Sequence, residues 1–384
     1  MTETPHIIVA TIEESDPARP ALVVATADLA QVGEVLDHLG VRTAGTEGPP
    51  ALGLTRLTLK DASDGPIDEL DGLLAELRRR ISAAGGGLVP PIGKDREASS
   101  TLAMMRGGNP KPTGLAPETL DAGEFAASAV LPGVGEAPGV RIGLVDTTSV
   151  PWDAPPGQVQ AWQGHAGFVI GIVESTAPGV EVIHRPALSE AGGRGTGWTV
   201  ASAIIELAAL QPDILLLPLA CFTADGQPPL LIERAIAAVP ASTLIIAAAG
   251  NQTLDAGWSA LGRGPTSPAW PAALPRVKAV GVDPAAIVEL AAPPTLGVPP
   301  WVDAVTTELD FVGEFFTGEV DVALEEPVEF TGHAKWRGTS FCAAYAAGLV
   351  AARMSGSGLT AAEAWNALLD DADSPLGRPE RKQP

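Results

Sequence analysis

The sequence predicts an α/β protein in which a doubly wound, mostly parallel sheet is flanked by helices and preceded by a small α+β domain. From residue 140 onward, short and nearly continuous apolar runs such as VRIGLVD (140–146) alternate with segments of helical periodicity. Strands that are apolar throughout are typical of parallel sheets covered on both faces. The first ninety residues differ, with an alternating run at 54–60 and an amphipathic helical pattern at 67–81.

The elements of the larger part follow one another at short intervals. Further strands are expected at 180–188, 213–222, 242–251 and 277–283, and helices at 167–173, 198–210 and 230–239. In such sheets, functional groups gather at the carboxyl ends of the strands.

The chain divides into four predicted parts. Residues 1–92 form the small α+β domain, with a strand at 21–26 and a helix at 29–40 among its elements, and residues 93–138, rich in Gly and Pro, form a linker. Residues 139–370 form the α/β domain, and residues 371–384 a flexible tail.

Composition excludes several function classes. The formal net charge is −22, so nucleic acid and anionic membrane surfaces would be repelled. The most apolar stretch is interrupted by Glu206, Pro212 and Asp213, which argues against a membrane span, and the N-terminus lacks the features of a signal peptide. Cys221 and Cys342 lie in apolar segments as expected of free, buried thiols, which favours a cytoplasmic location. Neither a metal nor a cofactor is expected, because no ligand spacing is visible.

Four polar residues occur where catalysis by serine would need them. Asp146 ends an apolar strand, His165 begins a small-residue helix, Asn251 ends the AAAGN run, and Ser340 follows Gly-Thr before an Ala-rich helix. A serine nucleophile needs a base, an acid that orients the base, and donors directed at the oxyanion. Each residue alone also has a structural explanation as a cap or turn residue; their order and contexts together are more specific.

These segments resemble those of the subtilisin-like serine proteases, the subtilases. The resemblance covers roughly residues 138–370 and rests on VRIGLVDTT, GHAGFVIGIVESTAPGVEV, IIAAAGN, PAWPAALPRVKAVGVD and GTSFCAAYAAGLVA. It implies an intracellular serine endopeptidase that cleaves peptide bonds of a peptide or protein substrate. Ser340 would be the nucleophile, His165 the base, Asp146 its orienter and Asn251 the oxyanion donor.

The resemblance also implies a substrate site and a role for the first domain. The walls of the first specificity pocket would come from two segments, made up of Leu219, Ala220, Ala248, Ala249 and Gly250. Ala220 stands where the family usually has glycine, which predicts a narrow pocket. Residues 1–92 invite comparison with the inhibitory propeptide of the family, and a recognition domain is the alternative.

The chain departs from the family pattern at several positions. Thr148 replaces the usual glycine, His165 is followed by Ala-Gly-Phe rather than Gly-Thr-His, and Ala344 replaces the proline after the serine. Two other functions therefore stay open: a catalytically weak pseudoprotease or binding scaffold, and an acyl-transfer, ligase-like variant suggested by Ala344.

Overall fold

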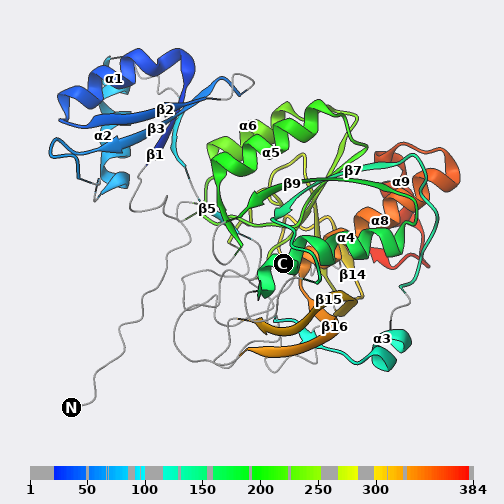
Figure 1. Ribbon diagram of the computed structural model, residues 1–384. Helices are drawn as coiled ribbons and strands as arrows, with labels where there is room; N and C mark the ends of the chain where they lie inside the picture. Colours follow the sequence, from blue (N-terminus) through cyan, green and yellow to red (C-terminus); the bar gives the residue numbers. More distant parts are fainter. Residues whose placement is uncertain are drawn as a thin grey trace.

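The computed structural model (Figure 1) describes residues 21–379 apart from 49–51, 66, 68, 85–90, 96, 100–115, 129–130, 154–158, 190–192, 224–225, 252–266, 284–297, 309 and 323–326. Its largest unit is a seven-stranded sheet in the order β17-β14-β13-β12-β11-β7-β9, in which neighbouring strands are parallel except at the β14–β17 edge. The strands are β7 (Arg141–Thr147), β9 (Glu181–Leu188), β11 (Ile214–Leu217), β12 (Leu244–Ala248), β13 (Lys278–Val282), β14 (Ala304–Thr306) and β17 (Leu376–Gly377). The predicted mostly parallel sheet is therefore present.

Helices cover both faces of this sheet. One face packs against α4 (His165–Thr176) and α8 (Thr339–Ser357), and the other against α5 (Gly197–Ala209) and α6 (Leu230–Ala238). Successive side chains of β11 alternate between the two layers: Ile214 and Leu216 join the first, and Leu215 and Leu217 the second. Burial on both faces is why the strand reads as a continuous apolar run.

Helix α8 is the central helix of the domain, and its first thirteen residues are buried. Its small side chains allow close packing against α4. A Cβ atom at Gly348 would lie 2.6 Å from the Cβ of Thr176, so a larger residue cannot be accommodated without a shift. The next helix, α9 (Ala361–Asp370), begins with a capping box between Thr360 and Glu363, the pattern that these two residues predict.

A long hairpin that the sequence analysis did not predict completes the α/β domain. Strands β15 (Asp310–Asp321) and β16 (Val328–Arg337) pair antiparallel and are flanked by β8 (Val159–Gln160) and β6 (Glu118–Thr119). A register shift between Glu314 and Thr317 turns two consecutive side chains, Phe315 and Phe316, into the core. The hairpin thereby contributes aromatic rings to the buried cluster that also contains residues of α4 and of η3 (Ala161–Gly164).

The N-terminal unit has the element order β-α-β-β-α-β. It consists of β1 (Ala21–Ala25), η1 (Thr26–Asp28), α1 (Leu29–His38), β2 (Arg42–Glu47), β3 (Leu54–Lys60), α2 (Leu70–Ala84) and β4 (Ile92–Lys94). Its four strands form an antiparallel sheet in the order β2-β3-β1-β4. Leu22 and Val24 face its own helices, whereas Val23 points to the opposite face.

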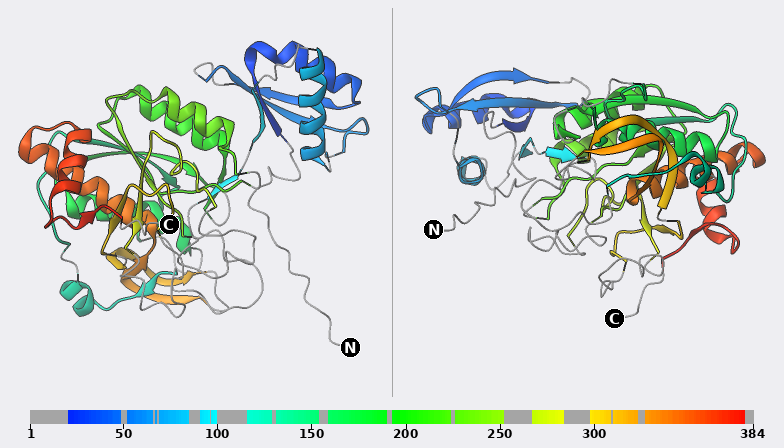
Figure 2. Two further views of the ribbon diagram at one scale, coloured as in Figure 1. Left: turned by 180° about the vertical axis from the view of Figure 1, so that it is seen from behind. Right: turned by 60° about the horizontal axis from the view of Figure 1, so that its bottom comes forward.

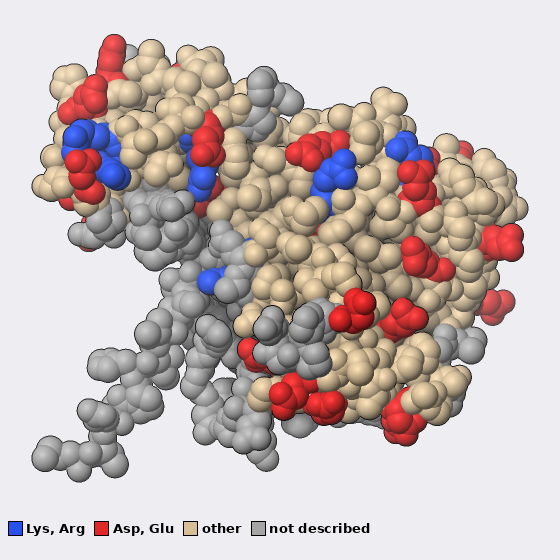
Figure 3. Space-filling model, viewed as in Figure 1, with Lys and Arg blue, Asp and Glu red and all other residues tan. Residues whose placement is uncertain are grey.

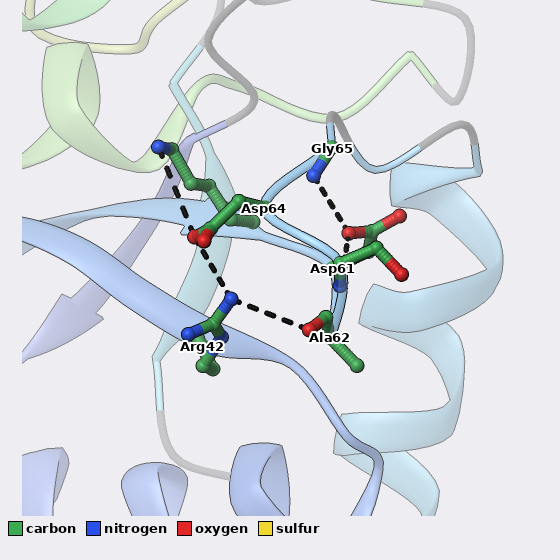
Figure 4. Close-up of polar contacts among 7 residues, drawn as sticks. Arg42, Asp61, Ala62, Asp64 and Gly65 are labelled. Atoms are coloured by element: carbon green, nitrogen blue, oxygen red, sulfur yellow. Dashed lines mark hydrogen bonds and ion pairs between the residues drawn. The ribbon is translucent and has the colours of Figure 1, made fainter.

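The loop after β3 is fixed by polar contacts (Figure 4). Asp61 Oδ1 accepts hydrogen bonds from the main-chain N–H groups of Ser63 and Gly65, both at 2.7 Å. Asp64, in the left-handed region with φ of 67°, forms an ion pair with Arg42 at 2.8 Å. Because all partners are exposed or partly exposed, these contacts shape a turn and add little to stability.

The second face of the N-terminal sheet lies against the α/β domain, beside α5 and α6 (Figures 1 and 2). Val23, Leu52 and Leu54 belong to the same buried cluster as residues of both helices. A Cβ at Gly93 would lie 3.3 Å from the Cβ of Leu230, the first residue of α6. The two units therefore share one apolar interface.

Two predicted boundaries differ from the structure. Residues 93–138, predicted as a linker, include β5 (Glu97–Ser99), β6 and α3 (Ala122–Ser128). Within the predicted tail, β17 pairs with β14, and Leu376 is buried. Both β5 and β17 pair with distant segments, so they leave no local periodicity; residues 1–20 and 380–384 lie outside the described part.

One face of the molecule shows how its charged side chains are distributed. On the face drawn in Figure 3, Asp and Glu side chains lie singly or beside Lys and Arg rather than in one patch. Among the helices that the structure describes, none has the length and apolarity needed to cross a membrane.

Candidate active site

Asp146 lies near the carboxyl end of β7 and is fully buried. Its Oδ1 atom accepts a hydrogen bond from the Thr147 main-chain N–H at 2.5 Å and lies 2.7 Å from Nδ1 of His165. Because the carboxylate oxygen accepts the proton of Nδ1–H, the neutral imidazole is the tautomer in which Nε2 is unprotonated. The pair therefore has the geometry of a base held by an acid.

His165 is the first residue of α4 and is also fully buried. Thr147 ties the helix start to the end of β7, because its Oγ1 accepts a hydrogen bond of 3.2 Å from the N–H of Ala166. Rings of Trp336 and Phe341 flank the imidazole, with centroids 5.7 and 5.3 Å away. His165 Nε2 has no hydrogen-bond partner among the described residues, so it can receive a proton.

Ser340 is the second residue of α8 and is fully buried. Gly338 precedes the helix with φ of 150°, a conformation that only glycine adopts readily. The Ser340 hydroxyl donates to the main-chain oxygen of Pro218 at 3.0 Å. In this orientation the hydroxyl is directed at Pro218 rather than at His165.

Asn251 follows β12 and contacts the same turn. Its Oδ1 atom accepts hydrogen bonds from both the N–H and the Oγ1 of Thr339, each at 2.9 Å. These two donors fix the amide orientation, which leaves Nδ2 as the free donor group. Nδ2 is buried and has no partner among the described residues, and a Cβ at Gly338 would lie 3.3 Å from it.

The predicted pocket residues lie at the ends of two neighbouring strands. Leu219 and Ala220 follow β11, and Ala248, Ala249 and Gly250 end or follow β12. All five are buried, and Gly250 has a φ of 91°. Ala220 shares a cluster with Phe222 and Ala269, and Ala249 shares one with Val302 and Val305. The space around both alanines is thus closely filled; their role as pocket walls stays a prediction.

Cys342 is a second potential nucleophile near Ser340. It is fully buried, and burial raises the pKa of its thiol to about 12. The thiol also donates to the main-chain oxygen of Glu308 at 3.5 Å. A thiol with this pKa is protonated at neutral pH and is not nucleophilic.

Three residues that support the site were not predicted as such. Thr147 and Thr339 position His165 and Asn251, and Trp336 contacts the imidazole. Thr339 had a sequence signal, since it lies inside the Gly-Thr-Ser segment before the predicted helix. Trp336 comes from β16 in the unexpected hairpin.

The fold and this constellation define a protein of subtilisin-like fold. Its solved structural neighbours include fervidolysin from Fervidobacterium pennivorans, a keratinolytic enzyme related to subtilisin, with a TM-score of 0.55 and 13% identity. That match covers 93% of this chain and 57% of the other, so the chain spans little more than half of fervidolysin. No family model and no curated protein matches the sequence.

Two further neighbours are described as maturation or lanthipeptide proteases. A lanthipeptide protease has a TM-score of 0.41 and 20% identity over 62% of this chain and 81% of its own. The prenylagaramide maturation protease PagA has a TM-score of 0.43 and 18% identity over 62% and 85%.

Proposed function

We propose that the chain is a serine endopeptidase of the subtilisin type that acts in the cytoplasm on a peptide or protein substrate. One observation carries the proposal: Asp146 and His165 form a buried pair, 2.7 Å apart, in the domain where α8 presents Ser340. The resemblance of the surrounding segments to subtilases and the subtilisin-like fold support it.

The proposed reaction follows from these positions. The Ser340 hydroxyl leaves the Pro218 carbonyl, passes its proton to Nε2 of His165 and attacks the substrate carbonyl carbon. Asp146 stabilises the imidazolium that forms. The Nδ2 group of Asn251 and the main-chain N–H of Ser340, at the start of α8, donate to the oxyanion. His165 then protonates the leaving amine, and water hydrolyses the acyl-enzyme.

The nucleophile can be tested by intact-mass analysis with a fluorophosphonate probe. We expect one adduct on the wild-type chain and on Ser357→Ala, a serine variant at the exposed end of α8, and none on Ser340→Ala. The adduct should map to Ser340. If the folded wild-type chain forms no adduct, it is either an inactive scaffold or a site blocked by the N-terminal unit, and labelling of a chain without that unit separates the two. Capture of the acyl group by added amines would indicate a ligase-like variant.

We further propose that the N-terminal unit inhibits this site while docked. Strand β5 pairs antiparallel with β10 (Arg194–Thr196) in a two-stranded sheet directly before α5. Addition of a strand to an exposed edge is also how extended peptides bind. A Cβ at Gly195 would lie 2.0 Å from the main-chain oxygen of Ala187, so β10 requires glycine at this position.

Asp95 anchors the same contact and is buried, with 1% of its side chain exposed. It accepts a hydrogen bond from the N–H of Trp198 in the first turn of α5 at 3.0 Å and pairs with Arg56 at 2.8 Å. An anion at a helix N-terminus is favourable. Burial outweighs the attraction of Arg56 and raises the pKa of Asp95 to about 6, so this group stabilises docking most below pH 4, and the contribution is lost as the pH rises through 6.

Reversing the charge of Asp95 should release the unit. Asp95→Lys places a cation beside Arg56 and against the positive end of α5, so we expect faster fluorophosphonate labelling of Ser340. Asp37→Lys makes the same charge change at an exposed position of α1 and should leave the rate unchanged. Equal labelling rates in the two variants would contradict inhibition by docking.

A further inference from the structure

The indole ring of Trp152 packs against the start of α4, the helix that begins with His165. Trp152 belongs to the loop after β7 and is half-buried against the core cluster that also contains residues of α4. Its ring centroid lies 4.9 Å from that of Phe316 and 5.7 Å from that of Phe315, both in the β15–β16 hairpin. The ring therefore links the hairpin to the start of α4.

Two glycines make this contact possible. A Cβ atom at Gly167, in the first turn of α4, would lie 2.6 Å from Cζ2 and 2.7 Å from Cη2 of Trp152. At Gly164, the residue before the helix, a Cβ would lie 3.2 Å from Cζ3 of the same ring and 2.6 Å from Cε2 of Phe315. In the sequence, His165 thus lies between two positions at which aromatic rings pack directly on the main chain.

The segment that carries the acid also holds the helix that carries the base. Thr147 ties Ala166 to the end of β7 through a hydrogen bond of 3.2 Å, and Trp152, in the loop that follows, adds an apolar contact to the same helix start. Oδ1 of Asp146 and Nδ1 of His165 are 2.7 Å apart, and both residues are fully buried. Because hydrogen bonds depend steeply on distance and angle, a small displacement of the helix start would weaken this one.

We propose that Trp152 is a positioning residue, whose ring packs on the main chain at Gly164 and Gly167 and thereby holds His165 at hydrogen-bond distance from Asp146. This role rests on the proposed function and deepens it, because the Asp146–His165 pair supplies the base of the proposed reaction. Trp152 acts through the main chain of α4 rather than on a reacting atom. Removal of the ring leaves a space into which the helix start can move, and a larger residue at Gly167 pushes the ring and the helix apart.

Two substitutions in α4 separate this contact from a general effect on the helix. Alanine is a better helix former than glycine, so Gly→Ala inside a helix normally stabilises it. Gly171→Ala is the matched control, because apart from the helix main chain no described residue places an atom within 4 Å of its Cβ position. Gly167→Ala instead forces a methyl group against the Trp152 ring. We expect it to slow fluorophosphonate labelling of Ser340 by about 10- to 100-fold, whereas Gly171→Ala should keep the parent rate.

A double variant tests whether the ring transmits the effect. Trp152→Ala alone should slow labelling to a similar extent as Gly167→Ala. Adding Gly167→Ala to Trp152→Ala should cause no further loss, because the ring that the methyl group would meet is gone. If the two losses multiply, the ring and Gly167 act independently and the proposal is overturned. Parent labelling rates in both single variants overturn it as well.

A second readout does not require catalysis. In the full chain carrying Ser340→Ala, which prevents self-cleavage, Nδ1–H of His165 should give a low-field ¹H NMR resonance, because the proton is held in a buried hydrogen bond; His165→Gln assigns it. At one fixed pH, we expect this resonance in the parent and in Gly171→Ala, and its loss or shift in Trp152→Ala and Gly167→Ala.

The resonance keeps the positioning role separate from the proposed activity. An unchanged resonance in folded Trp152→Ala and Gly167→Ala overturns the role, and Gly167→Ala decides alone if Trp152→Ala does not fold. Failure of the probe to label the parent would count against the proposed peptidase, whereas the resonance would still decide whether Trp152 positions His165.

Discussion

Asp146→Asn should lower kcat by about 10⁴-fold, the loss found when the acid of a serine protease triad is replaced in this way. The structure supplies the reason. Oδ1 of Asp146 accepts from both the Thr147 N–H and His165 Nδ1. In the variant, the Thr147 and His165 donors hold the amide oxygen at the Oδ1 position, but the neutral amide no longer stabilises the imidazolium that forms when His165 takes the proton of Ser340. Steady-state hydrolysis of a peptide substrate and the rate of fluorophosphonate labelling measure the effect.

Asp153→Asn is the matched control, because it makes the same chemical change at an exposed position after β7. We expect it to keep wild-type kcat. Thermal unfolding of both variants shows whether the buried substitution also weakens the fold. If folded Asp146→Asn retains more than about a tenth of the wild-type labelling rate, Asp146 does not orient the base as proposed.

The parts of the site that the sequence predicts are those that end parallel strands. Asp146 and Asn251 each follow an apolar run, and the rule that such ends meet at one edge of the sheet places them in one region before any contact is known. The run of small residues after Ser340 indicates a helix that packs closely against other helices and the sheet. Ser340 therefore lies at the start of a buried helix. Local pattern and topology agree at these three positions.

Other contributors to the site depend on contacts between distant segments. Thr339 bonds to Asn251 across 88 positions, and nothing in either segment specifies the partner. The β15–β16 hairpin has consecutive buried phenylalanines at a register shift, which breaks the alternation that identifies a strand. For this reason the sequence does not predict that Trp336 contacts His165. Strand β5 is recognisable only through its pairing with β10.

Asn251→Ala should lower kcat by about 10²–10³-fold with little change in KM, because an oxyanion donor acts mainly in the transition state. The alanine variant removes two things at once. It deletes the Nδ2 donor, and it also deletes the Oδ1 acceptor that holds the Thr339 N–H and hydroxyl. A fall in kcat alone therefore does not separate loss of the donor from displacement of the Ser340 turn.

Two further variants separate these effects. Asn251→Asp keeps an acceptor for Thr339 and removes the donor, so it should lose about as much kcat as Asn251→Ala if donation matters. Thr339→Val removes one of the two bonds that fix the amide but leaves Nδ2 in place, and we expect only a several-fold loss. The reverse order, with Thr339→Val severely impaired and Asn251→Asp nearly active, would mean that Asn251 serves the turn rather than the oxyanion. If the variants instead raise KM to a similar extent and leave kcat unchanged, Asn251 serves substrate binding.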